Sequence, residues 1–395
     1  MFPNQLSYVN QLNSCRYIEP LADQYERNVN KMPELTPREL VKLALNHKET
    51  PRIPFSFGFG INLPAKLKLM EHLGHKDIHE TSAYLHNYED IIRHVPIPYI
   101  GPADRSMTFA DGRHVDIWGV VREPITYTKD GEYHEICHHP MAEIDSIADL
   151  DAFRWPSPDW FDYSAIPGLL QKLNPDGKRA VMLGNGNIFE LTWYMRGYEQ
   201  SLMDLVAEPE FIEEIFKRIT AYHIEFFDRA LAAAKGGIDL IFTADDIAGQ
   251  TGMLMSPQIW KNHLLPWHKK LNARLHQHGV KIIYHTDGAA HSAVEGLIDM
   301  GIDAWEAVQM DAQGMDADKI KAAAGNKLAF HGGISVQQLL PFSTPEVVRS
   351  EVSRLMQVLG KGGGYIAAPS HAVQAGTPPE NIMAMLETAR PDLLK

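Results

Sequence analysis

The chain has 395 residues, 45% hydrophobic and 22% charged, which is the composition of an ordinary globular protein. A net charge of −13 argues against nucleic-acid partners, which need a basic surface, and no apolar run reaches the roughly 20 residues of a membrane span. Cys15 and Cys137 are the only cysteines, too few for a disulfide framework or a thiolate-rich zinc site. Because the N-terminus also lacks a signal-peptide pattern, we expect a cytoplasmic protein.

The beginning of the chain predicts an arm followed by a helix. Residues 1–35 are polar and weakly periodic, as in an N-terminal arm or a pair of loosely attached helices. Thr36 then stands at a good N-cap position and Pro37 at the first helical position. We therefore expect a single domain over residues 36–395.

The next part of the chain is rich in β signals. Residues 52–59 (RIPFSFGF) are typical of a strand, and short β-like pieces separated by turn residues predict a β-rich insertion near 95–140. The aromatic stretch at 154–163 (RWPSPDWFDY) is interpreted as a packing loop, with a lid over a pocket as the alternative.

From residue 179 onward, apolar strand-like runs alternate with amphipathic helical stretches. This alternation indicates parallel strands that are buried on both faces. The strands are expected at 179–186, 237–246, 281–288, 302–309, 327–333 and 364–371, and the helices at 209–234, 257–279, 289–300, 316–324 and 344–360. Together with 52–59 and one strand from 95–121 they make eight, which predicts an α/β fold, a distorted (β/α)8 TIM barrel. The alternative, a doubly wound open sheet, usually carries a GxGxxG turn, and the sequence has none.

In such a barrel the active site is built at the carboxyl ends of the strands. Six consecutive strands of this sequence end in polar or ionisable residues, although buried polar groups cost free energy unless they are paired or solvated. These residues are Asn185; Asp245 and Asp246, followed by Gln250; His285 and Asp287; Glu306 and Gln309; His331; and His371, followed by Gln374. The pattern predicts an active site there, with Asn185, Gln250, His331 and Gln374 contacting the substrate.

Some of these residues have the chemistry of metal ligands. Two imidazoles, His285 and His371, with the carboxylates of Asp287 and Glu306, suit zinc with an open position or another divalent ion. The alternative is structural: His285 hydrogen-bonds inside the barrel mouth, and Asp287 caps the helix that begins near Ala289.

The pair Asp245-Asp246 also has two interpretations. One carboxylate could cap the following loop or pair with an arginine. In the interpretation that we favour, one of them faces the barrel mouth and orients the substrate or acts as an acid or base. His331 could likewise be a core histidine.

Seven sequence motifs occur in order over residues 35 to 390: LTPRELVKLALNHKETPRIPFSFG (35–58), DIWGV (116–120), DDIAGQTGMLMSPQIW (245–260), YHTDGAA (284–290), GMDADKI (314–320), FHGGISVQQLLPFSTPEVV (330–348) and GGGYIAAPSHAVQAGTPPENIMAM (362–385). In these motifs the chain resembles the uroporphyrinogen decarboxylase superfamily, and most closely its methyltransferase-like branch, which includes corrinoid-dependent methyltransferases. The resemblance implies a distorted barrel with its site at the carboxyl ends of the strands.

Methyltransferases of this branch bind zinc through a His-x-Cys pair after one strand and a cysteine after the last. The matching positions here are His285, Asp287 and His371, so both thiolates are replaced. The resulting site is harder and more Lewis acidic, and better suited to polarise the oxygen or nitrogen of a methyl donor. Glu306 is then a candidate fourth ligand or proton donor, with Asp245 and Asp246 as the other catalytic candidates.

The resemblance therefore implies a zinc-dependent methyltransferase, or demethylase, that acts on a small O- or N-methyl compound. The acceptor would be a corrinoid on a partner protein, because the corrinoid-binding pattern Asp-x-His-x-x-Gly is absent and its nearest match, DIHETS (77–82), lacks the glycine. A homodimer is left open.

Two rival functions remain. The first is a lyase that decarboxylates a small acid. The decarboxylase branch grips its substrate with an arginine-rich N-terminal motif, whereas IPFSFGFGINLP contains no arginine, so a lyase would depend on cations such as Arg196 or Arg113. The second is a non-catalytic binding barrel, whose strand-end residues would pair with one another without a metal.

Overall fold

A computed structural model describes residues 35–128 and 131–394. The chain divides into two units, Met1–Thr36 and Pro37–Lys395, and every helix and strand given below belongs to the second unit. The predicted N-terminal arm lies almost entirely outside the described residues. Helix α2 (Pro37–Leu45) begins at the proline that the sequence predicts as its first residue.

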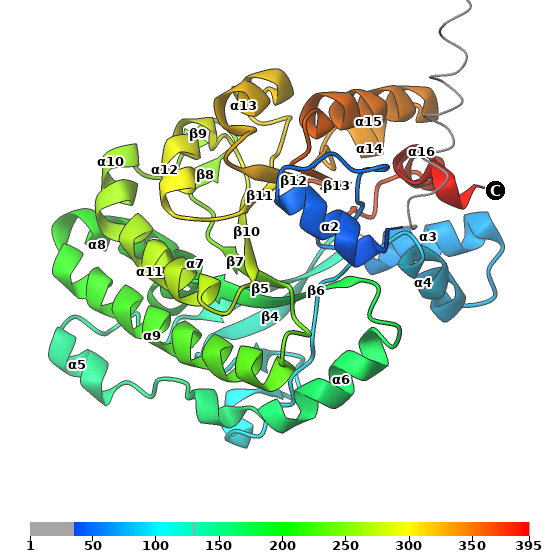
Figure 1. Cartoon of the computed structure of the whole chain (residues 1–395). Coiled ribbons are helices and arrows are strands. Elements are labelled where there is room, and N and C mark those ends of the chain that lie inside the picture. The colour runs from blue at the N-terminus through cyan, green and yellow to red at the C-terminus, as the bar shows by residue number, and fades with distance from the viewer. Residues whose placement is uncertain (1–34, 129–130, 395) are drawn as a thin grey trace, which may run out of the picture. The chain divides into compact units, whose positions relative to one another are not determined.

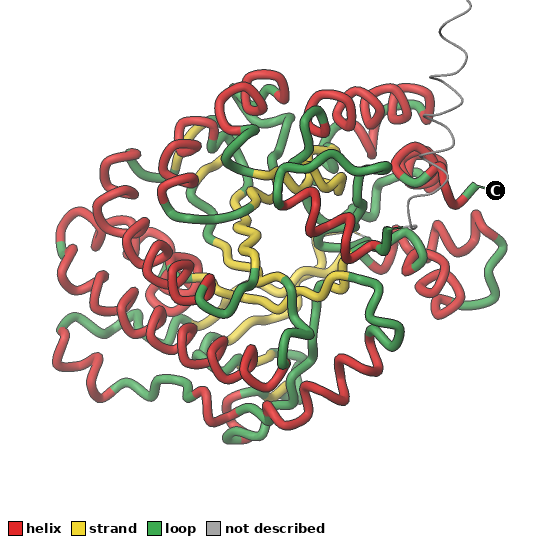
Figure 2. Tube along the Cα trace, viewed as in Figure 1, coloured by secondary structure: helices red, strands yellow, loops and turns green. Residues whose placement is uncertain are grey.

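The centre of the second unit is a ring of parallel strands. Seven of them pair in the order β1-β6-β7-β10-β11-β12-β13. Their bounds are β1 (Ile91–Ile92), β6 (Ala180–Asn187), β7 (Leu240–Ala244), β10 (Lys281–Thr286), β11 (Ala304–Ala307), β12 (Ala329–Ile334) and β13 (Tyr365–Pro369). The segment at Phe55 closes the ring: it forms a parallel bridge with Ala367 of β13, and its carbonyl accepts the N–H of Asp90 next to β1. Figure 2 shows the strands around one centre with helices outside them, which confirms the distorted (β/α)8 barrel.

One barrel strand was placed wrongly by the sequence analysis. The strand expected within 95–121 is instead the two-residue β1, just before that range. Its two residues carry too little pattern to be recognised as a strand.

Helices cover the outside of the barrel (Figure 1). They are α3 (Leu63–Leu73), α4 (Ile78–His86), α5 (Ile147–Ala152), α6 (Ile166–Leu173), α7 (Phe189–Arg196), α8 (Tyr198–Ala207), α9 (Pro209–Ala234), α10 (Pro257–Ile259), α11 (Leu265–His276), α12 (Val294–Asp299), α13 (Ala317–Ala324), α14 (Leu339–Phe342), α15 (Pro345–Gly360) and α16 (Pro379–Ala389). The 26-residue α9 has the bounds that its hydrophobic period predicts. Asp77 of the DIHETS segment is the N-cap of α4, accepting backbone N–H groups from His79 and Glu80.

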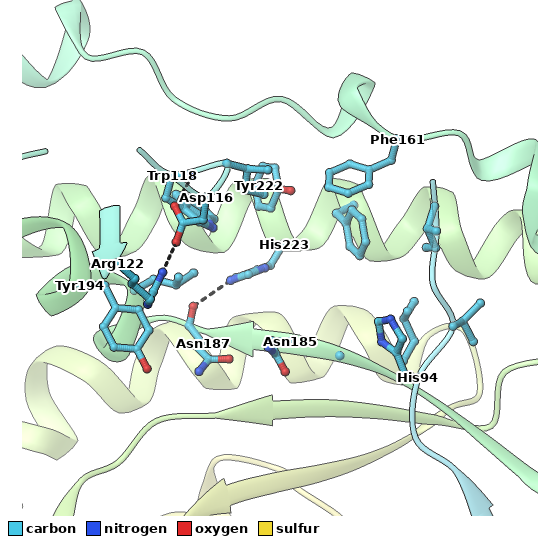
Figure 3. Close-up of a pocket in the computed structure, with 17 residues that line it drawn as sticks. His94, Asp116, Trp118, Arg122, Phe161, Asn185, Asn187, Tyr194, Tyr222 and His223 are labelled. Atoms are coloured by element: carbon cyan, nitrogen blue, oxygen red, sulfur yellow. Dashed lines mark hydrogen bonds and ion pairs between the residues drawn. The ribbon is translucent and has the colours of Figure 1, made fainter. Parts of the chain in front are cut away.

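The predicted β-rich insertion is a four-stranded antiparallel sheet between β1 and β6. Its strands are β2 (Met107–Thr108), β3 (His114–Val115), β4 (Val121–Thr128) and β5 (Gly131–His138), paired in that order. The turn between β3 and β4 carries Asp116 and Trp118, and β4 carries Arg122, all of which face a cavity (Figure 3). A second, smaller hairpin, β8 (Ala248–Gly249) with β9 (Gly252–Met253), follows β7.

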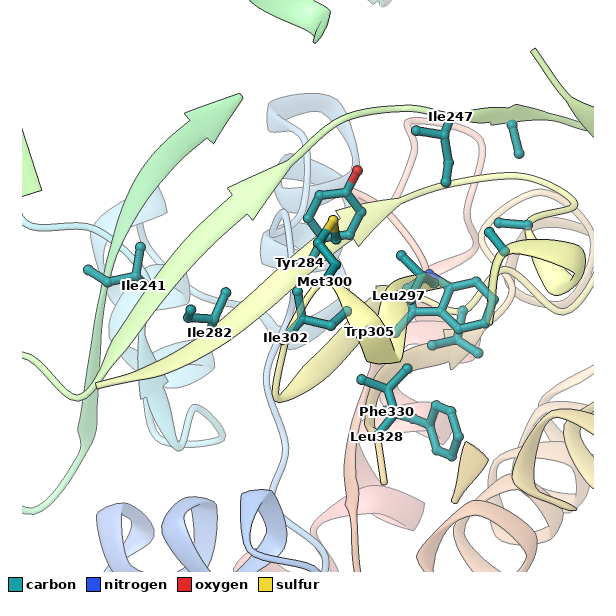
Figure 4. Packing of buried hydrophobic residues seen from close by; sticks show 14 of the residues in the cluster. Ile241, Ile247, Ile282, Tyr284, Leu297, Met300, Ile302, Trp305, Leu328 and Phe330 are labelled. Carbon is teal, nitrogen blue, oxygen red and sulfur yellow. The ribbon is translucent and has the colours of Figure 1, made fainter. Parts of the chain in front are cut away.

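Alternate residues of each barrel strand point to opposite sides. The inward set forms one buried cluster with residues of α2: Val41, Ala44, Leu45, Ile91, Ala180, Met182, Leu240, Phe242, Ala244, Ile283, Ala304, Ala329 and Ile366. The outward set, which includes Ile241, Ile282 and Trp305, packs with Leu297 and Met300 of the α12 region (Figure 4). This alternation decides which strand-end side chains enter the barrel mouth.

Within the described part of the chain, no helix combines the length and the apolar character needed to cross a bilayer.

Candidate active site at the barrel mouth

Three strand-end side chains meet in the barrel mouth as a candidate metal site. Asp246 continues the inward alternation of β7, and His285 and Asp287 continue that of β10. His285 Nε2 lies 3.8 Å from Asp246 Oδ1 and 3.8 Å from Asp287 Oδ1. One ligand atom from each residue lies within 4.8 Å of the others, so one imidazole and two carboxylates can converge on a divalent ion.

Asp245 points the other way, into the layer between barrel and helices. Its fully buried carboxylate accepts the backbone N–H groups at the start of α7, from Ile188, Phe189 and Glu190, and it bonds His268 Nε2 at 2.5 Å. These hydrogen bonds occupy the carboxylate oxygens of Asp245 and stabilise the N-terminal end of α7. Of the two adjacent aspartates, the geometry favours Asp246 for chemistry.

Glu306 is held in a buried network behind His285. Its carboxylate accepts two hydrogen bonds from Arg93, at 2.9 and 3.0 Å, and bonds His331 Nδ1 at 2.7 Å. Burial alone would raise the pKa of Glu306, but the charges of Arg93 and His331 outweigh it and hold that pKa well below its usual range. Glu306 therefore stays ionised, which favours a positioning role over that of proton donor. His331, predicted to contact substrate, is fully buried against it.

The strand register places Glu306 next to the candidate metal ligand His285, and His331 next to Glu306. In the paired strands, His285 is the partner of Glu306, and Glu306 is the partner of His331. His285 Nδ1 lies 3.9 Å from Glu306 Oε1, so its other nitrogen, Nε2, is the one directed at the aspartates. Metal-binding histidines commonly turn their second nitrogen toward a carboxylate in this way.

Burial shifts the titration of the cluster. Desolvation, with the nearby charges of Asp246 and Glu306, raises the pKa of Asp287 to about 8. Desolvation also lowers the pKa of His285 to about 4, which keeps its imidazole neutral and able to bind a metal. In addition, Asp287 Oδ1 is buried and accepts no hydrogen bond from any described residue. A buried acceptor without a donor is the condition that a cation relieves.

His371, the third ligand predicted by the resemblance, lies close to the cluster, and one aromatic ring contacts both imidazoles. The centroids of His371 and His285 are 6.2 Å apart. Phe59 stacks on His371 with a centroid distance of 4.7 Å and contacts His285 edge-on at the same distance. The structure thus brings His285 and Asp287 together with Asp246, and the role of His371 stays a prediction.

A cavity of about 390 Å³ lies between β6, the insertion and α9. In Figure 3 the rings of Trp118, Tyr222 and Phe161 form one wall, and Asn185 and Asn187 of β6 lie on the opposite side. Phe161 belongs to the aromatic stretch 154–163, so the lid interpretation of that stretch fits the structure.

Glu190 lies next to the cavity. Asn187 and Tyr194, which both line the cavity, donate hydrogen bonds to its carboxylate. Burial raises the pKa of Glu190 to about 8, with further contributions from the charges of Asp246 and Asp245. Glu190 is therefore an ionisable group that two side chains of the cavity wall hold in place.

Other residues singled out from the sequence have structural partners. Gln250 and Gln309 form a reciprocal amide pair at 2.9 and 3.3 Å, and Gln309 also accepts from the Gly288 N–H. Gln374 donates to the Ala372 carbonyl in its own loop. Asn185 lines the cavity as a substrate contact would.

The cations suggested for a lyase are not in the cavity wall. Arg196 is buried against Asp204 and the carbonyls of Met141 and Ile144, and Arg113 pairs with Asp111 on the surface. Arg93 instead pairs with Glu306, and Arg122 lines the cavity; neither was predicted from the sequence. Arg93 follows the very short β1 and Arg122 lies in the insertion, so no strand pattern pointed to either.

Comparison with known proteins agrees with this architecture. The family described as "Uroporphyrinogen decarboxylase (URO-D)" matches residues 135–391. The uroporphyrinogen decarboxylase of Psychromonas ingrahamii is 26% identical over 180 residues, 44% of this chain and 47% of that protein, so the match spans about half of the relative's length. The enzyme of the same name from Methylococcus capsulatus is 22% identical over 255 residues, 62% of this chain and 69% of that protein.

A solved structure, a methyltransferase from Methanosarcina mazei, superposes with a TM-score of 0.64 at 18% identity, covering 92% of this chain and all of that one. This likeness shows the fold alone. The family match extends over well more than half of the chain and includes the strands that carry the candidate site. The chain belongs to the uroporphyrinogen decarboxylase family.

Proposed function

We propose that this protein is a methyltransferase that moves a methyl group from a small O- or N-methyl substrate to a corrinoid carried by a separate protein, with zinc as a Lewis acid. The observation that carries the proposal is the cluster of Asp246, His285 and Asp287 at the barrel mouth. Two carboxylates and one imidazole form a three-ligand set that leaves a position open, as catalytic zinc sites do. Zinc bound there would polarise the heteroatom that carries the methyl group.

The protein's own residues supply orientation and charge. Glu306 lies 3.9 Å from His285 Nδ1, while Arg93 and His331 keep Glu306 ionised. Glu190, with its raised pKa, is protonated at neutral pH and can donate a proton on the cavity side.

The charges at the mouth speak against a polycarboxylate substrate. Both guanidinium groups are already paired, Arg93 with Glu306 and Arg122 with Asp116. The carboxylate of Asp246 would repel an anion in the absence of a metal. A decarboxylase would have to break one of the two ion pairs to hold its substrate.

Decarboxylation of a small acid remains the second candidate, because of the family match and because Arg122 lines the cavity. The two candidates are separated by incubating the zinc-loaded protein with reduced cobalamin and candidate methyl donors, and separately with small aromatic and aliphatic acids. Methylated cobalamin supports the proposal; carbon dioxide release without methyl transfer replaces it with the lyase. Absence of bound metal in the purified protein, with neither product, favours a binding barrel.

The affinity for zinc should rise with pH and then level off. Below pH 8 Asp287 carries a proton that the metal must displace, so affinity is expected to increase about tenfold per pH unit from pH 6 to 8. His285 contributes no slope in this range because its pKa lies near 4. Competition with a chromophoric chelator measures the curve, and Asp287→Asn should flatten it. A slope that persists in Asp287→Asn would assign the proton to another group.

Phe59 should control how fast the metal exchanges. The Phe59 side chain is 42% exposed, and its ring contacts both His285 and His371. In the sequence, Phe59 is flanked by Gly58 and Gly60, which both have positive φ. In Phe59→Ala the imidazoles are uncovered, so we expect zinc loss to a chelator to accelerate on the order of tenfold with thermal stability little changed. Phe59→Leu, which keeps an apolar cover, is the matched control. Equal exchange rates in all three proteins would show that the ring does not shield the site.

A further inference from the structure

The cavity between β6, the insertion and α9 is lined by aromatic rings from three separate parts of the chain. Trp118 comes from the insertion, Phe161 from the 154–163 loop, and Tyr222 and Phe226 from α9 (Figure 3). Trp118 and Tyr222 meet edge-to-face at 4.9 Å, Phe161 and Phe226 edge-to-face at 5.1 Å, and Tyr222 stacks on Phe226 at 6.2 Å. The rings therefore form one continuous wall.

The side of the cavity opposite these rings is polar, with the amides of Asn185 and Asn187 and the imidazole of His94. Asn185 is exposed there with an amide that can both donate and accept, and Asn187 lies two residues further along β6. The charges in the wall cancel, because Arg122 is paired with Asp116 at 2.7 Å and lies over the Tyr194 ring. A slot with rings on one side and amides on the other suits a flat molecule that has one apolar face and polar substituents at its edge.

A cationic methyl donor fits this cavity less well. A methylated ammonium also binds to aromatic rings, but it is usually neutralised by a nearby carboxylate. Asp116, which lines the cavity, is already paired with Arg122. Glu190, behind Asn187 and Tyr194, is held largely protonated at neutral pH by burial, which raises its pKa to about 8.

We propose that this cavity binds an aromatic methyl ether, with the ring against Trp118 and Tyr222 and an oxygen substituent at Asn185. The inference rests on the proposed function for its chemistry. The bond between methyl carbon and ether oxygen breaks, and the oxygen keeps its electron pair. The reduced corrinoid of the partner supplies the pair for the new bond to carbon, and the phenolate takes a proton from solvent to leave as a phenol.

The leaving group favours this substrate class. A phenol has a pKa of roughly 10, whereas water, and by analogy an alcohol, has a pKa near 15.7. A phenolate is therefore the more stable anion by about six pKa units, so breaking an aryl ether needs less stabilisation of the leaving group by the protein than breaking an alkyl ether.

The test is a direct binding measurement that needs neither metal nor corrinoid. Quenching of tryptophan fluorescence and calorimetry are used to compare 2-methoxyphenol with cyclohexyl methyl ether and with tetramethylammonium on the full chain. We expect 2-methoxyphenol to bind at least about tenfold more tightly than either, because only it gains ring contacts and an amide hydrogen bond. Equal affinity of the two ethers, tighter binding of tetramethylammonium, or no binding of 2-methoxyphenol overturns the inference.

Substitutions inside and outside the cavity lining show where 2-methoxyphenol binds. Trp118→Leu and Asn185→Ala should each weaken 2-methoxyphenol about tenfold, whereas Trp193→Leu and Asn262→Ala, which lie outside the cavity lining, should not. Because Trp118 is buried, Asn185→Ala at an exposed position keeps the test valid if Trp118→Leu fails to fold. Unchanged binding in Asn185→Ala overturns the placement.

The failure of this inference and the failure of the proposed function give different results. If 2-methoxyphenol binds in the cavity but no donor methylates reduced cobalamin, the binding site stands and methyl transfer is wrong. If cobalamin is methylated by an alkyl donor while 2-methoxyphenol does not bind, methyl transfer stands and the aromatic substrate is wrong.

Discussion

Replacing His285 with alanine is expected to abolish zinc binding and to lower kcat/KM for methyl transfer by at least about a thousandfold. His285 is the only nitrogen ligand in the cluster, and its loss leaves two carboxylates without the donor that zinc prefers. A thousandfold loss corresponds to about 4 kcal/mol, which is in the range of the charge stabilisation that a metal supplies. Elemental analysis of the purified variant measures the metal, and stopped-time assays measure the rate.

The adjacent aspartates provide a matched pair of controls. Asp246→Asn should lose zinc and keep the stability of the wild type, because the asparagine oxygen can still accept the hydrogen bond that Asp246 Oδ1 receives from the Asp287 N–H. Asp245→Asn should keep zinc binding but lose about 1–3 kcal/mol of stability, because Asp245 accepts from the start of α7 and from His268. If Asp245→Asn lost the metal and Asp246→Asn retained it, the assignment of the cluster would be wrong.

Arg93→Met is expected to destabilise the protein by about 3–5 kcal/mol. Arg93 is the bidentate partner of Glu306, and removing it leaves the buried carboxylate with His331 as its remaining partner. Urea denaturation at pH 7 measures the loss. The double variant Arg93→Met/Glu306→Gln removes both charges and should recover most of the stability, within about 1 kcal/mol of wild type. A double variant as unstable as Arg93→Met alone would show that lost side-chain packing, and not an unpaired charge, causes the destabilisation.

The pH dependence of this destabilisation has a definite sign. The folded protein holds the pKa of Glu306 below the unfolded value, so the pair contributes stability above the unfolded pKa of about 4.3 and loses it as the pH falls through the folded pKa. The difference between wild type and Arg93→Met should thus be largest at high pH and should shrink as the pH falls, because burial raises the pKa of Glu306 once Arg93 is removed.

Much of the barrel could be predicted because the later strands are long and regular. The alternation within β7 also distinguishes the two aspartates: Leu240, Phe242 and Ala244 face inward, so Asp246 does and Asp245 does not. The alternation of inward and outward positions along β7 is therefore enough to tell Asp246 from Asp245. The same alternation brings His285 and Asp287 to one side of β10.

The network behind the site could not be predicted in this way. Arg93 reaches Glu306 across 213 residues of sequence, from a strand of only two residues. The aromatic wall has a similar cause, because Trp118, Phe161 and Tyr222 come from an insertion, a loop and a helix with no shared period. Only the closed barrel brings these residues together.

The insertion of β2 to β5 has a consequence for how this protein could acquire new specificities. His285 lies on a barrel strand, and Asp246 and Asp287 follow directly after barrel strands, whereas Trp118 and Arg122 belong to a separate small sheet and its turn. Changes in the small sheet can reshape one wall of the cavity without moving the metal ligands. Exchange of residues 107–138 between relatives would then alter the choice of substrate while the chemistry is inherited unchanged, so that recognition and reaction can diverge on separate parts of one chain.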